Sequence, residues 1–146
     1  MKRISKGLTR AGFNVVREKI ETVPWHPAAP SNEHADPVMP KDCYFETHIA
    51  VVIKDNDNRD QLQTLINEDF PDAHLSRNAF KSTDDGYVQM ITYRTYSGTY
   101  ETFKRRAQGI REALKECGFK IEDVVTEFSI YDTKVTHDAE WISRIA

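Results

Sequence analysis

Two histidines and an arginine, His48, His74 and Arg94, stand in segments where apolar and polar residues alternate. Alternation at a period of two predicts β-strands with one apolar and one polar face, so these side chains are expected together on the polar face of a sheet. There a planar guanidinium could bind a phosphate between two imidazoles, of which one removes a proton and the other protonates the leaving oxygen. The pattern therefore predicts His48, His74 and Arg94 as catalytic residues.

Other polar residues of these and neighbouring segments are expected to bind the ligand. Carboxylates such as Glu46 and Glu127 could orient an imidazole or hold a divalent ion, although we expect no resident metal or other cofactor. The chemistry that suits this set is a metal-independent phosphoester hydrolase or transferase that uses the histidine pair. The ligand-binding residues predicted in this way are Glu46, Ser76, Asn78, Arg17, Lys19, Glu127 and Tyr131.

Four strands and two helices must position these residues. A helix is predicted from Thr99 to Cys117, because apolar residues recur there at steps of three and four and Gly118 follows. A second is predicted from Arg59 to Asp69, after an Asn58-x-x-Gln61 capping box and before a proline. The predicted strands are Cys43–Ile53, Asp72–Lys81, Tyr87–Tyr96 and Val124–Thr133, with the turn Asp84-Asp85-Gly86 joining the second to the third.

The resulting order of strand, helix, strand, strand, helix, strand predicts an α+β, ferredoxin-like (βαββαβ) fold. Its antiparallel sheet carries both helices on one face, and the usual spatial order is fourth, first, third, second strand. His48 and His74 would then lie roughly 10 Å apart across the third strand, with Arg94 between them. The facing of Tyr87–Tyr96 is ambiguous, and a slip of one residue would turn Arg94 toward the helices.

The length of 146 residues, 39% of them apolar, predicts one compact domain. A proline-rich loop lies near the start, and the roughly 23 residues before it are too few to bury a core of their own. The predicted layout is a single domain over 1–146, made of a helix-strand extension (1–23), the proline-rich loop (24–41), the βαββαβ core (42–133) and a short C-terminal helix (138–146). In the extension, the helix is expected around Lys2–Ala11 and the strand around Phe13–Val23.

The extension shares a short pattern with the long helix. Leu8-x-x-Ala11-Gly12-Phe13 matches Leu114-x-x-Cys117-Gly118-Phe119. Two interpretations remain open, a partial internal repeat or a helix stop that both segments use.

The proline-rich loop holds polar and aromatic residues whose roles the sequence does not settle. His26, His34, Asp36 and Cys43 could assemble a metal site, but their spacing fits no standard zinc motif, so incidental histidines are the preferred interpretation. Trp25 is predicted to anchor the loop to the body of the protein rather than to stack on a ligand.

Charge and hydropathy narrow the classes of partner. The formal net charge is −3, with no long block of one sign, which argues against general binding of duplex DNA or anionic membranes. The longest apolar stretch, Ile49–Ile53, is far shorter than the ~20 residues of a membrane helix. With no apolar segment typical of a secretion signal at the N-terminus, we expect a cytoplasmic protein. Its expected partner is a small phosphate-containing ligand such as a nucleotide, a phosphodiester or an RNA end.

An alternative function stands beside that expectation. A sheet with one solvated face shows polar alternation in any case. The protein could therefore be a non-catalytic α+β protein whose open sheet face forms a homodimer or docks a protein partner.

The sequence also resembles known protein families in two respects. His74-Leu-Ser76 has the His-x-Ser form of one half of the two-histidine phosphodiesterase motif, whereas His48-Ile-Ala50 lacks the hydroxyl of the other half. A wider set of segments resembles a little-characterised family of small ferredoxin-like proteins from bacteria and phages, which implies one integrated domain and no particular activity. The segments that carry it are Arg17-Glu-Lys-Ile-Glu21, Pro24-Trp25, Tyr44-Phe-Glu-x-His48, Ala73-His-Leu-Ser-Arg-Asn78 and Glu127-Phe-x-x-Tyr-Asp132.

Overall fold

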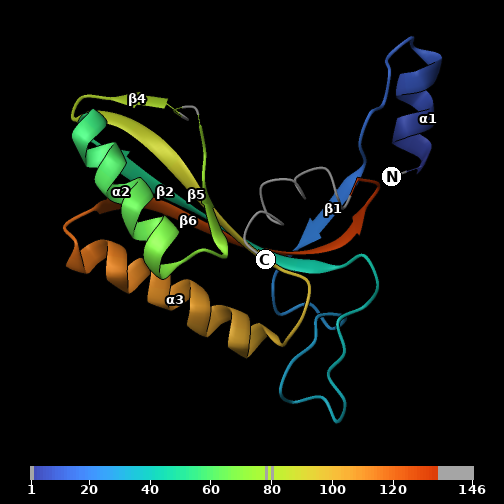
Figure 1. Cartoon of the computed structure of the whole chain (residues 1–146). Coiled ribbons are helices and arrows are strands. Elements are labelled where there is room, and N and C mark those ends of the chain that lie inside the picture. The colour runs from blue at the N-terminus through green and yellow to red at the C-terminus, as the bar shows by residue number, and fades with distance from the viewer. Residues whose placement is uncertain (1, 78, 80, 135–146) are drawn as a thin grey trace.

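Three helices and six strands make up the part of the chain that the computed structural model describes, residues 2–77, 79 and 81–134 (Figure 1). Asn78 and the expected C-terminal helix over 138–146 lie outside these residues. The elements are, in order, α1 (Lys2–Arg10), β1 (Lys19–Thr22), β2 (Tyr44–Ile53), α2 (Asn56–Asp69), β3 (Ala73–Leu75), β4 (Lys81–Thr83), β5 (Gly86–Thr95), α3 (Tyr100–Glu116) and β6 (Lys120–Asp132).

The strands form one antiparallel sheet in the order β1-β6-β2-β5-β3, which differs from their order in the chain. In addition, β4 pairs with β5. The sheet has six strands, one more than the four core strands and the extension strand that were predicted, so the ferredoxin-like order is not confirmed. The predicted strand Asp72–Lys81 is wrong, since β3 ends at Leu75 and β4 begins at Lys81. β1 pairs with β6 only opposite Phe128–Asp132, which leaves the first part of β6 with β2 as its partner among the described strands.

Helices α2 and α3 lie on the same side of the sheet in Figure 1, and their apolar stripes form the core with it. Phe103 of α3 stacks on two strand residues, Phe45 and Tyr93, with ring centroids 5.2 Å apart in both pairs. The period-two alternation of β2 directs its core residues to this side. The other buried members from β2, α2 and α3 are Ile49, Val51, Ile53, Leu62, Ile66, Ala107, Ile110 and Leu114.

Each long helix begins directly after a polar cap residue. Thr99 caps α3 in a capping box with Thr102, as the predicted boundary requires. In α2 the cap is Asp55, whose carboxylate accepts a hydrogen bond from the Asn58 backbone N–H (2.8 Å). The predicted Asn58 box is therefore wrong, and the helix begins one turn earlier because the acidic residue takes the capping role.

The pattern shared by the two helix ends is a helix stop. Phe13 N donates to Leu8 O (3.0 Å) as Phe119 N donates to Leu114 O (2.9 Å), and the glycine before each phenylalanine has a positive φ, 88° at Gly12 and 81° at Gly118. Both ends are thus Schellman motifs. The strand that follows begins at once after α3 but only at Lys19 after α1, so β1 is shorter than the predicted strand 13–23.

Within the described residues, no helix combines the length and apolar character needed to cross a bilayer.

Candidate functional site

The sheet face opposite α2 and α3, called the open face below, carries most of the predicted site. In the register, His48 of β2 pairs with Thr92 of β5, and Thr92 pairs in turn with His74 of β3. Paired residues of antiparallel strands point to the same side, so both imidazoles lie on the open face. The residue between them is Thr92, which corrects the prediction that Arg94 stands there, because Arg94 pairs with Glu46.

A buried carboxylate organises the centre of this face. Glu46 is only 1% exposed, and its oxygens face three basic side chains, which with it are called the Glu46 cluster: Lys19, His48 and Arg94. Arg94 Nε donates to Oε2 (2.5 Å), Lys19 Nζ donates to Oε1 (3.0 Å), and His48 Nε2 lies 3.3 Å from Oε1. Burial alone would raise the pKa of Glu46, but the contact with His48 and the charges of Arg94 and Lys19 outweigh it and lower the pKa to about 2.

His48 is the member of the Glu46 cluster that reaches solvent with its ring, since 31% of its side chain is exposed. Its Nδ1 lies 2.9 Å from the Thr92 hydroxyl, while Nε2 faces Glu46. A carboxylate and a hydroxyl on opposite sides of an imidazole fix the plane of the ring. The ring is thus held in a defined position where one edge can meet a ligand.

Arg94 lies on the open face opposite Glu46, but its side chain is buried there. The guanidinium is buried, stacks over the Tyr44 ring (4.4 Å from Cζ to the centroid) and donates from Nη1 to Tyr96 Oη (3.2 Å). Burial would lower its pKa, but Tyr96 and Glu46 more than compensate, so its pKa lies above the ordinary value. Arg94 therefore stabilises Glu46 as a buried cation, a different role from the direct ligand contact that was predicted.

A second carboxylate, Asp132, extends the polar network toward the sheet edge. Arg17 binds it with two parallel contacts, Nε to Oδ1 (2.9 Å) and Nη2 to Oδ2 (2.5 Å), and Tyr44 Oη donates to Oδ2 (2.8 Å). Burial acts to raise the pKa of Asp132, but the hydrogen bonds from Arg17, the Lys134 backbone and Tyr44 lower it well below its usual range. Asp132 was not predicted as a site residue.

Lys19 and the neighbouring acids join the two networks. Lys19 contacts Glu21 as well as Glu46, and both contacts keep its pKa raised against the opposing effect of burial. Glu127 pairs with Glu46 across β6 and β2. Its pKa is raised by burial and then by Glu21, whose charge lies beside it. Glu21 follows Lys19 at a strand period of two but was not among the predicted ligand-binding residues.

Two predicted ligand-binding residues have other positions. Tyr131 pairs with Ile20 and donates to Glu18 (3.3 Å), on the side of β1 away from Lys19, because the register shifts between Ile20 and Glu21. Ser76 Oγ accepts the Met90 backbone N–H (3.1 Å), so its hydroxyl helps to join the strands at the end of β3.

The open face is polar only over part of its length. Beyond His48 the paired residues are small or apolar: Ala50, Val52 and Val88 are buried, and Met90 packs against them. Lys81 of β4 and Glu122 of β6 form an ion pair (3.0 Å) from opposite sides of these strands. The polar part of the open face therefore does not extend to its β4 end.

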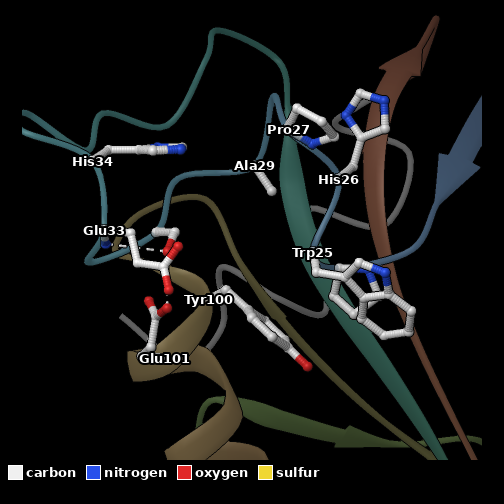
Figure 2. A pocket seen from close by; sticks show the side chains of 10 residues that line it. Trp25, His26, Pro27, Ala29, Glu33, His34, Tyr100 and Glu101 are labelled. Carbon is white, nitrogen blue, oxygen red and sulfur yellow. Dashed lines mark hydrogen bonds between the residues drawn. The ribbon is translucent and has the colours of Figure 1, made fainter.

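A separate hollow of about 390 Å³ lies where the proline-rich loop meets the start of α3 (Figure 2). Glu101 holds the loop there, accepting from Ser31 Oγ and from the Asn32 backbone N–H at 2.9 Å each. Trp25 lines the hollow and is 69% exposed, so the prediction that it anchors the loop is wrong.

The loop histidines do not gather into a metal site. His26 and His34 both line the hollow of Figure 2, but Asp36 and Cys43 do not. Among the residues described, no three or more histidine, cysteine and acidic side chains are placed to hold one metal ion.

Comparisons with protein-family models, with curated proteins and with solved structures find no match. The function is therefore proposed from the geometry alone.

Proposed function

We propose that the open face binds a small phosphate-containing ligand over Thr92, between His48 and His74. The observation that carries this proposal is the partly exposed imidazole of His48, positioned by Glu46 at one nitrogen and Thr92 at the other. A hydroxyl group can rotate about one bond, so a phosphate oxygen can replace it at Nδ1. His74, on the other side of Thr92 in the register, supplies the second imidazole.

The charges of the site support an anionic ligand of modest size. Lys19 keeps its positive charge, and part of its side chain is exposed. The negative charge of the ionised Glu46 is balanced by the cations around it. A nucleotide, a phosphodiester or an RNA end is the class of ligand that this arrangement suits. With a phosphoester, one imidazole would take the proton from the attacking oxygen and the other would protonate the leaving oxygen, as a hydrolase or transferase requires.

For the fold, we propose a ferredoxin-like domain enlarged by two strands. In support, β6, β2, β5 and β3 lie side by side in that order, and α2 and α3 share one face. On this interpretation β1 and β4 are the additions, and β1 brings Lys19 to the open face.

A thermal-shift experiment tests the ligand. AMP, cyclic AMP and a short oligonucleotide are compared with adenosine, which lacks phosphate. We expect a phosphate compound to raise the melting temperature of the wild type. His48→Ala and His74→Ala should abolish that rise, while the matched loop variant His26→Ala keeps it. If a phosphoester is hydrolysed, each of the first two variants should lower turnover about 100-fold. No rise with any phosphate compound, or a rise retained in both variants, would refute the proposal.

A second candidate function uses the same face for protein contact, either in a homodimer or with another partner. The observation that favours it is the exposure of two large apolar side chains, Val125 opposite His48 and Tyr96 beside Arg94. Sedimentation velocity separates the candidates: a dimer that Val125→Asp dissociates supports contact through this face. A monomer at working concentration that binds phosphate compounds excludes the homodimer.

A further inference from the structure

The N-terminal helix α1 presents an apolar side that nothing in the described chain covers. None of its residues is buried, and Ile4, Leu8 and the following Phe13 are all exposed. In Figure 1, α1 stands apart from the sheet, beyond β1 and away from α2 and α3. A nine-residue helix has little stability of its own in water, so a contact with another surface would be needed to hold it.

The matching helix stop in α3 shows what such a pair of side chains does when it is covered. There the leucine and phenylalanine of the motif, Leu114 and Phe119, are 0% and 7% exposed because they pack into the core. In α1 the equivalent Leu8 and Phe13 are 42% and 63% exposed. The backbone geometry is the same at both ends, so the difference is that no surface within residues 2–77, 79 and 81–134 covers α1.

The charges around α1 define the chemistry of that partner. Residues 2–10 hold four cations and no acid, whereas the whole chain has a net charge of −3, so the remainder carries −7. At 100° per residue, the basic residues of the helix fall along one side and Ile4 and Leu8 along another. The partner must therefore be acidic and must offer some apolar surface. The cations are Lys2, Arg3, Lys6 and Arg10.

The exposed side of α2 has both properties. It forms a shallow hollow of about 510 Å³ in which four acidic side chains surround the half-buried Leu65. α2 and α1 lie at opposite ends of the molecule in Figure 1, so these complementary surfaces do not meet within one copy. They are placed to meet between copies. The residues that line the hollow are Asp57, Asp60, Gln61, Thr64, Leu65, Glu68 and Asp69.

We propose that α1 of one copy docks into the α2 hollow of a second copy of this chain. Ile4 and Leu8 would cover Leu65, and the lysines and arginines of α1 would face the acids of α2. When α1 of each copy contacts α2 of the other, the two contacts together form a two-fold dimer. This contact is independent of the open face and of any ligand bound there.

Charge reversal provides a test in which each half of the contact is altered separately. Lys6→Glu with Arg10→Glu cancels the net positive charge of α1, and Asp60→Lys with Glu68→Lys cancels the net negative charge of the α2 hollow. Each double variant alone should lose self-association by about tenfold or more in Kd, because the attraction between α1 and the hollow is removed. Mixed together, the two variants should associate again, since the introduced glutamates of one variant then face the introduced lysines of the other.

Sedimentation velocity at low and high salt measures the association, and circular dichroism checks that each variant is folded. The matched control is Lys104→Glu with Arg105→Glu, which reverses two exposed cations on α3 and should leave association unchanged. High salt should weaken the wild-type pair. A monomeric wild type at low salt, or failure of the mixed variants to associate, would overturn the proposal.

Anionic lipid is the competing surface for a basic amphipathic helix. Co-sedimentation with vesicles of phosphatidylcholine, with and without phosphatidylglycerol, separates the two. Binding to the anionic vesicles that Lys6→Glu with Arg10→Glu abolishes, from a wild type that stays monomeric, would replace the second copy by a membrane.

Discussion

The buried carboxylate of Glu46 should make a large and pH-dependent contribution to stability. In Glu46→Gln the amide keeps the shape of the side chain but removes the negative charge that Arg94 and Lys19 face. Arg94 is then a buried cation without its counter-charge, a situation that costs several kcal/mol in proteins.

The size of the effect follows from the pKa. Glu46 has a pKa of about 2 in the folded protein against 4.5 ordinarily, which corresponds to about 3 kcal/mol of stability at neutral pH. Because the folded-state pKa is the lower one, this stability is present above 4.5 and is lost as the pH falls toward 2. Protonation should remove about 1 kcal/mol by pH ~4 and about 2 kcal/mol by pH ~3.

Urea denaturation followed by circular dichroism measures the difference between wild type and Glu46→Gln at several pH values. Other carboxylates such as Asp132 titrate in both proteins, so they largely cancel in this difference. We expect a gap of about 3 kcal/mol at neutral pH that narrows in acid. Glu33→Gln, at an exposed loop position, serves as the control and should change little. A gap below about 1 kcal/mol, or one that stays constant down to pH ~4, would refute this account of the Glu46 cluster.

Two further changes test the helix ends by the same denaturation assay. Thr99→Ala removes the cap of α3 and should cost about 1 kcal/mol, with Thr99→Ser close to wild type; equal losses in both would contradict the capping role. Gly118→Ala forces a side chain into a left-handed backbone and should cost about 1 kcal/mol, whereas Gly12→Ala, at the matching stop of the uncovered α1, should leave global unfolding of the monomer unchanged. An equal loss from both glycines would show that α1 packs within its own chain.

Strong periodicity explains which elements could be predicted. The apolar residues of α3 and the alternation of β2 continue over many residues, so α3 starts and ends within one residue of its prediction and β2 begins only one residue late. The segment after α2 shows the limit, since its alternation is too short to reveal that β3 stops at Leu75. Asp55 and Asn58 are both good capping residues, and only the hydrogen bond distinguishes them.

The sequence predicted which side chains share a face where the strands are regular, but not where their register is irregular. Alternation on β2 placed Glu46 and His48 on one face, and the register agrees, whereas the facing of β5 was ambiguous and only the register puts Arg94 on that face. The register shift between β1 and β6 exchanges the expected sides of Tyr131 and Asp132. No pattern in the sequence predicts this shift. The predicted strand order already made β2 and β5 neighbours, but the register that sets Arg94 opposite Glu46 is defined only by the fold.

The first part of β6 is an edge of the sheet that pairs with no described strand on its outer side. Unpaired strand edges can form hydrogen bonds with strands of other chains. Here the exposed positions Lys120, Glu122 and Asp123 are charged, and the register with β2 is irregular between Ala50 and Val51. Both features discourage another chain from extending the sheet. These charges therefore protect the strand edge against amyloid-like stacking. Replacing them with valine or threonine would remove this protection.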